Sequence, residues 1–257
     1  MWFWKRRSNM NYHLKMFLTW WIWLWRIYRI SVYARKYRHT PDYYTPQQRY
    51  DWLLKKVKKY LKLYNIKVTV EGYDNLPKAP CLLIPNHKSN ADALILMEAL
   101  SKKTASKEEM NKIATFLAKK ELSKKAVVKS ALNLIDSIYI DRNNFRDAFE
   151  SLTKFGTFIK ENRTYGVIFP EGTRVEEDGL GEFKSGAFKV AISHYLPIVP
   201  VVISDTRKAL NKNRWKKQEF KVKFLNPIKP STFMSMDPGA LADRVKSLME
   251  RELENES

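Results

Sequence analysis

The sequence predicts an α/β protein, with a mixed, largely parallel sheet flanked by helices and an amphipathic helical segment at the N-terminus. From Ile66 onward, short apolar runs alternate with helical stretches. These runs are nearly continuous in Val, Ile, Leu and Phe, which is typical of strands covered on both faces. Residues 1–36, in contrast, are rich in tryptophan and basic side chains, which indicates a separate helical region.

Length and charge restrict the class of protein. The chain has 257 residues, enough for one sizeable core, and a formal net charge of +20. This excess is self-repelling unless an anionic partner lies nearby, such as nucleic acid or an acidic membrane surface. Cys81 is the only cysteine, so no internal disulfide can form. We expect a buried structural thiol and a reducing, cytosol-facing location.

Tryptophan is concentrated in the first part of the chain. Six of the eight tryptophans lie in the first 25 residues, and no Asp or Glu precedes Asp42. Indoles beside aliphatic side chains are typical of a membrane–water interface, and they are unusual in a nucleic-acid-binding tail. The uncharged run from Met16 to Trp25 has ten residues, whereas a spanning helix needs about 20. Basic residues follow this run where a signal peptide would have its cleavage site, which excludes a signal peptide.

On a helical wheel this segment has two faces. The polar face carries Lys15, Thr19, Ile22, Arg26, Arg29 and Lys36, and the opposite face carries Phe17, Trp20, Trp21, Leu24, Ile27 and Tyr28. Such a helix lies in the membrane interface with its cations on headgroup phosphates. We therefore predict an N-terminal amphipathic helical membrane anchor. The alternative is a helix buried against a protein partner.

A second helix is predicted over residues 46–64, with Thr45 as its cap and Pro46 at its first position. Its lysine-rich side either packs with the first helix on the membrane or is simply a solvated face. Residues 1–64 thus form a basic, aromatic-rich, membrane-associating region, and residues 65–257 form the α/β domain. A final helix is predicted to begin at Asp237 and Pro238.

The predicted strands of the α/β domain share a dense apolar composition. They lie in residues 66–72 (IKVTVEG), 81–86 (CLLIPN), 113–120 (IATFLAKK), 137–142 (SIYIDR), 165–170 (YGVIFP), 197–204 (PIVPVVIS) and 220–226 (FKVKFLN). Helical stretches separate most of them, so consecutive strands are expected to run parallel. No Cys/His spacing in the sequence suits a metal site.

A histidine and an aspartate follow the run CLLI in the stretch PNHKSNAD. His87 and Asp92 are five residues apart, which suits a base and the acid that orients it. The alternative is structural, because Ser89 to Asp92 reads as the capping-box pattern S-x-x-D before an apolar helix. This stretch alone leaves both interpretations open.

Two further polar clusters follow buried strands. FPEGTR, residues 169–174, places Glu171, Gly172 and Arg174 after YGVIF, and Asp141 and Arg142 end another strand. Ligands of open α/β sheets bind outside the carboxyl ends of the strands, so these clusters are expected to converge on one cleft. Two arginines, with Lys119 and Lys120, would make it a phosphate site. The alternative for each arginine is a salt bridge to a neighbouring carboxylate.

These motifs give the sequence a clear resemblance to the 1-acylglycerol-3-phosphate acyltransferase (lysophosphatidic acid acyltransferase) family. Four blocks resemble the family's in order: N-H-x-x-x-x-D at residues 86–92, I-D-R at 140–142, FPEGTR at 169–174 and P-I-V-P-V at 197–201. K-x-E-L at residues 119–122 and F-K-x-G-A-F at 183–188 also fit. The resemblance covers about residues 66–204.

The sequence departs from the family's pattern at three places. Asp136-Ser137 stand where a glycine often precedes I-D-R, Tyr195-Leu196 stand where Gly-Val is common, and the acidic segment of residues 175–178 follows FPEGTR. These departures concern acyl-chain and donor preference rather than the reaction.

The resemblance implies that a fatty acyl group moves from a thioester to the 2-hydroxyl of lysophosphatidic acid. His87 would be the general base and Asp92 would orient it, with direct transfer and no acyl-enzyme. Ser89 is better explained by capping than as a nucleophile. The substrate phosphate would be held by Glu171, Gly172, Thr173, Arg174, Arg142 and Lys119. Within that set, Thr173 fits a local turn hydroxyl better than a ligand group.

The resemblance also implies no metal or bound cofactor, and acyl-CoA or acyl carrier protein as the co-substrate. The expected partners are lysophosphatidic acid, the acyl donor and an anionic membrane surface at the cytoplasmic face, with no nucleic acid. The nearest alternative is a glycerol-3-phosphate or other lysophospholipid acyltransferase. A more distant one is a non-catalytic basic protein that binds membranes or nucleic acid through its charge.

Overall fold

The structure, a computed structural model, describes residues 10–104 and 109–255. The predicted N-terminal segment begins before this range, so Trp2 and Trp4 lie outside the described residues.

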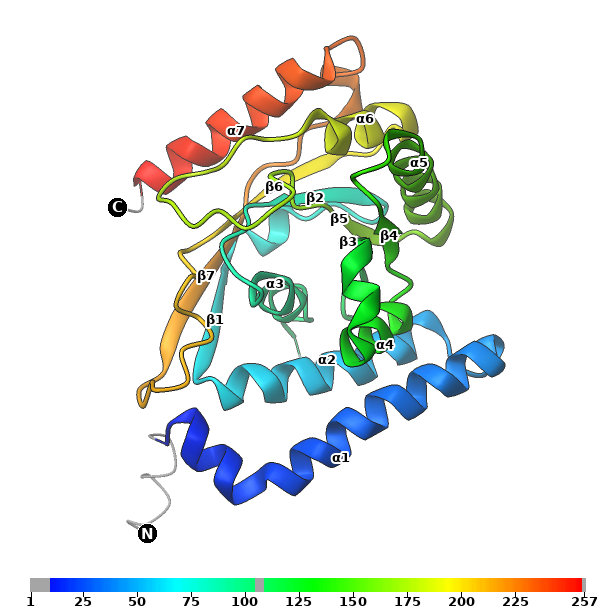
Figure 1. The fold of residues 1–257 in the computed structure, drawn as a ribbon. Helices are drawn as coiled ribbons and strands as arrows, with labels where there is room; N and C mark the ends of the chain where they lie inside the picture. Colours follow the sequence, from blue (N-terminus) through cyan, green and yellow to red (C-terminus); the bar gives the residue numbers. More distant parts are fainter. Residues whose placement is uncertain (1–9, 105–108, 256–257) are drawn as a thin grey trace.

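A seven-stranded sheet in the order β1-β7-β6-β2-β5-β3-β4 forms the centre of the protein (Figure 1). Its strands are β1 (Ile66–Glu71), β2 (Cys81–Pro85), β3 (Ala114–Lys119), β4 (Ile138–Ile140), β5 (Tyr165–Val167), β6 (Ile198–Ile203) and β7 (Gln218–Phe224). Every neighbouring pair is parallel except β6 and β7, which are antiparallel. The predicted mixed, largely parallel sheet flanked by helices is therefore confirmed.

Helices cover both faces of the central strands. The helices of the α/β domain are α3 (Asp92–Ala99), α4 (Ala126–Leu134), α5 (Phe145–Asn162), α6 (Ser185–His194) and α7 (Pro238–Asn255). In β2, Leu83 packs into a core shared with α2 (Pro46–Leu63) and α3, whereas Leu82 and Ile84 pack into a second core shared with α5, α6 and α7. Because successive side chains of a strand point to opposite faces, the continuous apolar run CLLI requires both cores.

The expectation of two covered faces is wrong for β1 and β7. Their apolar side chains, such as Val222, pack on one face only. The other face carries a ladder of charges, in which Lys67 pairs with Glu219 at 2.7 Å and Lys221 with Glu71 at 3.1 Å. The cause is visible in IKVTVEG and FKVKFLN, where polar and apolar residues alternate with the period of a half-buried strand.

The two N-terminal helices lie side by side along one side of the protein (Figure 1). α2 begins as predicted: Thr45 and Gln48 form a reciprocal capping box, and Pro46 occupies the first position. α1 (Tyr12–His39) is bent at Thr19, whose backbone leaves the helical region and whose hydroxyl donates to the Lys15 carbonyl at 2.6 Å. This back-bonding is a known cause of helix bending. α1 packs on α2 through aromatic contacts, such as the stacked rings of Tyr33 and Trp52 at 4.4 Å.

The polar face of α1 is only partly turned inward: Lys15, Thr19, Ile22 and Arg26 are partly buried, whereas Arg29 and Lys36 are exposed. Its apolar face is turned outward. The exposed side chains are Phe17 (76%), Trp20 (53%), Trp21 (54%), Leu24 (57%), Trp25 (54%) and Tyr28 (64%). The expectation that Lys15 meets lipid phosphates is wrong, because its ammonium group donates to the Lys62 carbonyl at 2.9 Å and to Asn65. The carbonyls at the C-terminus of α2 lack helical partners, and Lys15 supplies one.

A partly buried ion pair ties these helices to the turn between α4 and β4. The Arg49 guanidinium of α2 donates to Asp136 at 2.9 Å and to the Leu134 carbonyl at 2.8 Å, and the Tyr37 hydroxyl of α1 donates to Asp136 at 2.7 Å. Asp136 and Tyr195 have φ angles of 50° and 57°, in the left-handed region that favours glycine. Both stand where the family often has glycine, and at Asp136 the side chain is used to bind α1 and α2.

In residues 10–104 and 109–255, no helix combines the length and the apolar character needed to cross a membrane.

Candidate active site

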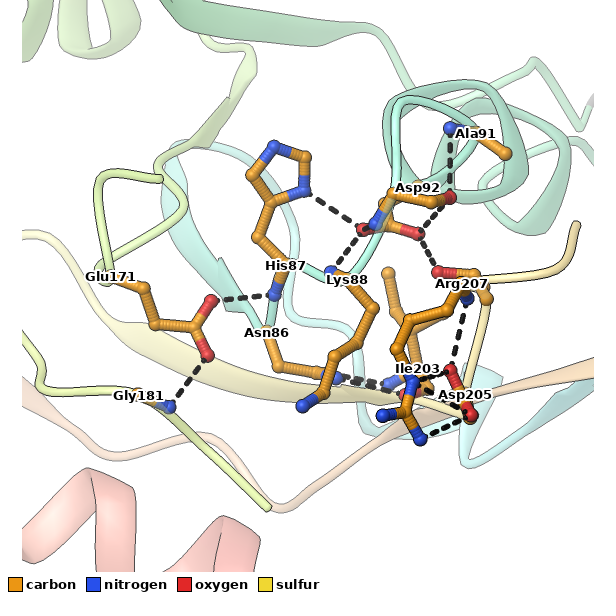
Figure 2. Close-up of polar contacts among 12 residues, drawn as sticks. Asn86, His87, Lys88, Ala91, Asp92, Glu171, Gly181, Ile203, Asp205 and Arg207 are labelled. Carbon is orange, nitrogen blue, oxygen red and sulfur yellow. Dashed lines mark hydrogen bonds and ion pairs between the residues drawn. The ribbon is translucent and has the colours of Figure 1, made fainter. Parts of the chain in front are cut away.

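His87 and Asp92 lie in the turn between β2 and α3. His87 Nδ1 is 2.8 Å from Asp92 Oδ2, Asp92 is fully buried, and the His87 side chain is 20% exposed. The ring is turned so that Nε2 points away from the carboxylate (Figure 2). No residue in the described part of the chain forms a hydrogen bond with Nε2. One ring nitrogen is therefore fixed by a carboxylate, and the other is open to a substrate.

The Asp92 carboxylate also holds the backbone of this turn. Oδ2 accepts from the N–H groups of Lys88 at 2.7 Å and Ser89 at 2.8 Å, and Oδ1 accepts from the hydroxyls of Ser89 and Thr206. Half of the predicted capping box is formed, because Asp92 accepts from the Ser89 N–H, but α3 begins at Asp92 with Ala91 as its N-cap and has no side-chain cap. The predicted contact between His87 and Asp92 is present, and its catalytic role stays a prediction. Both sets of contacts use the same carboxylate, whose two oxygens lie within hydrogen-bond distance of five polar atoms.

The position of the His87 ring is fixed by three further contacts. Phe169 stacks on the imidazole, with the ring centroids 4.2 Å apart. Asn86 accepts from the Ile203 N–H at 2.7 Å and donates to the Ile203 carbonyl at 2.9 Å, which joins the turn to β6. The His87 carbonyl accepts from the Val175 N–H at 2.9 Å. The turn is therefore bound on both sides by neighbouring elements, and the imidazole is preorganised.

Glu171 lies under the same turn (Figure 2). One carboxylate oxygen accepts from the His87 N–H at 2.6 Å, and the other accepts from the Gly181 N–H at 3.2 Å. The residue is 3% exposed, and burial raises the pKa of its carboxyl group against the opposing effect of these two N–H groups. A carboxylate would also repel a phosphate. The phosphate role expected for Glu171 stays a prediction, and its contacts favour a role in positioning His87.

Gly172 brings two cations together beside FPEGTR. It has a φ angle of 74°, and a Cβ atom there would lie 2.9 Å from Arg142 Nη1 and 3.3 Å from Lys184 Cε. Any side chain at this position would thus displace the Arg142 guanidinium and strain the backbone. Partial burial lowers the pKa of Arg142. The glycine is required for Arg142 and Lys184 to lie against this turn.

Arg142 and Arg174 have no carboxylate within ion-pair distance among the described residues. The salt-bridge alternative therefore fails for both arginines within that range, and both are exposed to solvent. Lys119 and Lys120 are engaged instead: Lys119 lies 3.3 Å from Glu121, and Lys120 lies 3.0 Å from Asp141. The two arginines are thus the better candidates for an anion.

Thr173 and Ser89 are the remaining residues considered for the predicted site. Thr173 is exposed and makes no hydrogen bond among the described residues. Ser89 is 8% exposed, and its Oγ donates to Asp92 and accepts from the Ala91 N–H at 3.0 Å. No cluster of three or more His, Cys, Asp or Glu side chains suited to a metal occurs in the described ranges. The acidic segment after FPEGTR is bound by Arg207, which donates to Asp178 at 2.6 Å.

Two residues at the site were not predicted from sequence. Thr206 donates to Asp92 from 114 positions away, and no local pattern marks it. Lys184 lies in the block F-K-x-G-A-F, which was noted only as a family resemblance, and its contact with the Gly172 turn depends on the tertiary fold.

Comparisons with known proteins show the family of this chain. The family model described as Acyltransferase matches residues 67–204. A probable 1-acyl-sn-glycerol-3-phosphate acyltransferase of Mycoplasma pneumoniae is 36% identical over 223 residues, covering 83% of this chain and 81% of that protein. The human 1-acyl-sn-glycerol-3-phosphate acyltransferase alpha is 31% identical over 190 residues, covering 73% of this chain and 64% of that protein.

A solved structure is similar in fold. The crystal structure of a 1-acyl-sn-glycerophosphate acyltransferase from Thermotoga maritima matches with a TM-score of 0.66 at 22% identity, covering 90% of this chain and 95% of that chain. At this identity the likeness supports the architecture alone.

Proposed function

We propose that this chain, which belongs to the 1-acyl-sn-glycerol-3-phosphate acyltransferase family, transfers a fatty acyl group from a thioester to the 2-hydroxyl of 1-acylglycerol-3-phosphate at a membrane surface. The product is phosphatidic acid. The observation that carries the proposal is the pair His87 and Asp92, with Nδ1 held at 2.8 Å and Nε2 open. Because the relatives of this chain are enzymes, the alternative of a non-catalytic basic binding protein is rejected.

His87 acts as general base through Nε2. The acceptor hydroxyl is a weak nucleophile near neutral pH, so its proton must be removed as its oxygen attacks the thioester carbonyl. The ester C–O bond forms, the C–S bond breaks, and the proton passes from the imidazolium to the leaving thiolate. Asp92 keeps the proton of the neutral ring on Nδ1 and stabilises the imidazolium that forms.

The acyl group passes directly from donor to acceptor. Ser89 is the hydroxyl nearest to the pair in sequence, but both of its hydrogen-bonding functions are occupied by Asp92 and the Ala91 N–H. It is also directed at a carboxylate and not at a base. This arrangement supports a capping role and argues against an acyl-enzyme on Ser89.

The cations around Gly172 bind the phosphate of the acceptor. Arg142 and Arg174 supply guanidinium forks, which match phosphate oxygens, and Gly172 leaves space for the Arg142 guanidinium. Lys119 contributes charge from the end of β3, and Thr173 lies in the same turn. Glu171 assists indirectly by holding the His87 backbone. No cofactor is required, and acyl-CoA or acyl carrier protein supplies the thioester.

The outward face of α1 contacts an anionic membrane at its cytoplasmic side. Its exposed aromatic residues, such as Trp20, Trp21 and Trp25, have a wet and a dry edge, which favours the interface. A protein partner is less well supported, because the net charge of +20 calls for an extended anionic surface. The substrate and product are lipids, so residues 1–64 serve as the membrane-associating region and residues 65–257 as the acyltransferase domain.

The test is an acyl-transfer assay with one labelled acyl thioester and several acceptors. Transfer to 1-acylglycerol-3-phosphate should exceed transfer to glycerol-3-phosphate and to lysophosphatidylcholine, with label at the 2-position of phosphatidic acid. A preference for glycerol-3-phosphate, or equal use of lysophosphatidylcholine, would contradict the proposed acceptor. Running the assay with acyl-CoA and with acyl carrier protein identifies the donor.

A further inference from the structure

The segment that joins β6 to β7 contains a basic loop, residues 206–217. Between Asp205 and Glu219 it contains no acidic residue, and it carries the six cations Arg207, Lys208, Lys212, Arg214, Lys216 and Lys217. It also contains Trp215, which is the only tryptophan after Trp52. No sequence motif assigns a function to this loop. The loop contributes one residue, Thr206, to the site described above.

The two arginines of the loop hold it in place. Arg207 donates to Asp205 and Asp178, and the Arg214 guanidinium donates to the carbonyls of Tyr64 at 3.3 Å and Ala209 at 3.2 Å. Both arginines therefore stabilise the position of the loop.

The lysines and the tryptophan are not used in this way. Lys208, Lys212, Lys216 and Lys217 are exposed, and none has a carboxylate within ion-pair distance in the described parts of the chain. The Trp215 indole is 52% exposed. The fold thus anchors the loop with its arginines and presents an uncompensated positive surface around one large aromatic side chain.

The basic loop lies beside the first turn of α1 (Figure 1). The Tyr12 N–H donates to the Lys212 carbonyl at 3.2 Å, and the Lys212 ammonium group lies 5.3 Å from the centre of the Tyr12 ring. Asn65 joins the two segments, because its side chain donates to the carbonyls of Met10 at 2.9 Å and Trp215 at 3.2 Å. The loop therefore lies against the N-terminal end of α1, the helix whose aromatic side chains are exposed.

We propose that the basic loop is a second lipid-binding element, in which lysines bind the phosphates of anionic lipids and Trp215 enters the headgroup region. The inference rests on the proposed membrane role of this protein, but it concerns a different segment from α1. Charge complementarity supports an anionic partner, and the exposed indole next to an aromatic helix face supports a lipid surface. A nucleic acid or an acidic carrier protein would explain the lysines but not the continuity with α1.

The loop would also connect the membrane to the catalytic pair. Its first residue, Thr206, donates to the buried Asp92 carboxylate, and Trp215 follows nine residues later in the same loop. Contacts at both the basic loop and α1 would fix the orientation of the α/β domain on the bilayer. A single amphipathic helix would leave the domain free to rotate about the helix axis.

The experiment measures partitioning of the full chain onto phosphatidylcholine vesicles with and without phosphatidylglycerol. The test variant is K212Q/K216Q/K217Q, and the matched control removes three exposed lysines of α5 and α6 as K154Q/K160Q/K189Q. Each lysine near an anionic surface strengthens partitioning about fivefold, so the test variant should lose roughly 10²-fold on anionic vesicles. Its partitioning onto neutral vesicles and its turnover of a soluble short-chain acceptor should equal those of the wild type.

The outcomes separate this inference from the proposed function. Loss on anionic vesicles in the test variant but not in the control, with recovery in K212R/K216R/K217R, supports the lipid-binding loop. Equal losses in test and control variants, or no loss, overturn it while leaving α1 as the anchor. Unchanged vesicle binding with weakened binding to acyl carrier protein or to RNA assigns the loop to that partner and also overturns it. If the wild type binds neither vesicle type, the membrane role fails for both segments.

Discussion

Replacement of Asp92 by asparagine separates the charge of this residue from its hydrogen bonds. The amide oxygen can take the place of Oδ2 and still accept from His87 Nδ1 and the two backbone N–H groups. The amide nitrogen then faces the hydroxyls of Ser89 and Thr206, which can rotate to accept. The turn is therefore expected to keep its structure, and only the negative charge that stabilises the His87 imidazolium is lost.

The distance between the two groups gives the size of the effect. For unit charges 2.8 Å apart at an effective dielectric constant of about 20, the attraction is about 6 kcal/mol, an upper bound for what the charge contributes. The surviving neutral hydrogen bond retains part of this, so we expect turnover to fall by roughly 10²–10⁴-fold at about 1.36 kcal/mol per decade. The Michaelis constant for the acceptor should change little, because Asp92 is fully buried and so cannot contact the acceptor phosphate.

The assay is steady-state acyl transfer with a labelled thioester and lysophosphatidic acid, with thermal unfolding as the control for the fold. Asp92→Ala is the comparison variant, since it removes every acceptor from the turn and should also destabilise the protein. Turnover of Asp92→Asn within a factor of a few of the wild type would refute the role of the charge in this reaction. A variant that melts much earlier than the wild type would refute the assumption that the amide fits the turn.

Four other changes test separate parts of the account. Arg174→Gln should raise the Michaelis constant for lysophosphatidic acid by roughly 10–100-fold, because a charge-assisted hydrogen bond is lost. An unchanged Michaelis constant would show that Arg174 does not bind the phosphate. Thr206→Val removes one donor to Asp92, so turnover should fall roughly tenfold with acceptor affinity intact; parallel changes in both would indicate a general loss of structure. Because burial raises the pKa of Glu171, its contribution to stability is complete below the usual value of 4.5 and is lost as pH rises through the folded pKa. Chemical denaturation at several pH values should thus find the wild type most stable relative to Glu171→Gln at low pH, and an opposite trend would contradict the raised pKa. Asp136→Gly keeps a residue suited to the left-handed backbone but leaves buried Arg49 without its carboxylate. Urea unfolding should therefore show that the free energy of unfolding falls by about 3 kcal/mol, and a fall well under 1 kcal/mol would show that the ion pair does not stabilise the protein.

Local sequence patterns predicted much of this fold. CLLI and IVPVVI are apolar at every position, and both lie in fully buried strands between two cores. Thr45, Pro46 and Gln48 predicted the start of α2 because capping depends on neighbours within one turn. In β1 and β7 the alternation of polar and apolar residues carried more information than their apolar content. The charged ladder was missed because the strands were interpreted from their apolar content and not from that alternation.

The site was predicted where motifs are local and missed where contacts are long-range. His87 and Asp92 lie five residues apart in one turn, so their spacing predicted their contact. Thr206 reaches Asp92 only because β6 is the neighbour of β2, a pairing that the sequence of either strand does not encode. The inward direction of Lys15 likewise depends on the Lys62 carbonyl at the end of α2, which comes within reach of Lys15 only in the folded protein.

The central claim is that the His87 imidazole takes the proton of the acceptor hydroxyl, and chemical rescue tests it most directly. Turnover of His87→Ala should be lower than that of the wild type by roughly 10²–10⁴-fold. Added imidazole can occupy the space between Phe169 and Asp92, and it should restore part of this activity in a saturable manner. The same imidazole should not restore Asp92→Asn, in which the ring is still present. Near-normal turnover of His87→Ala without imidazole, in a protein that remains folded, would contradict the claim.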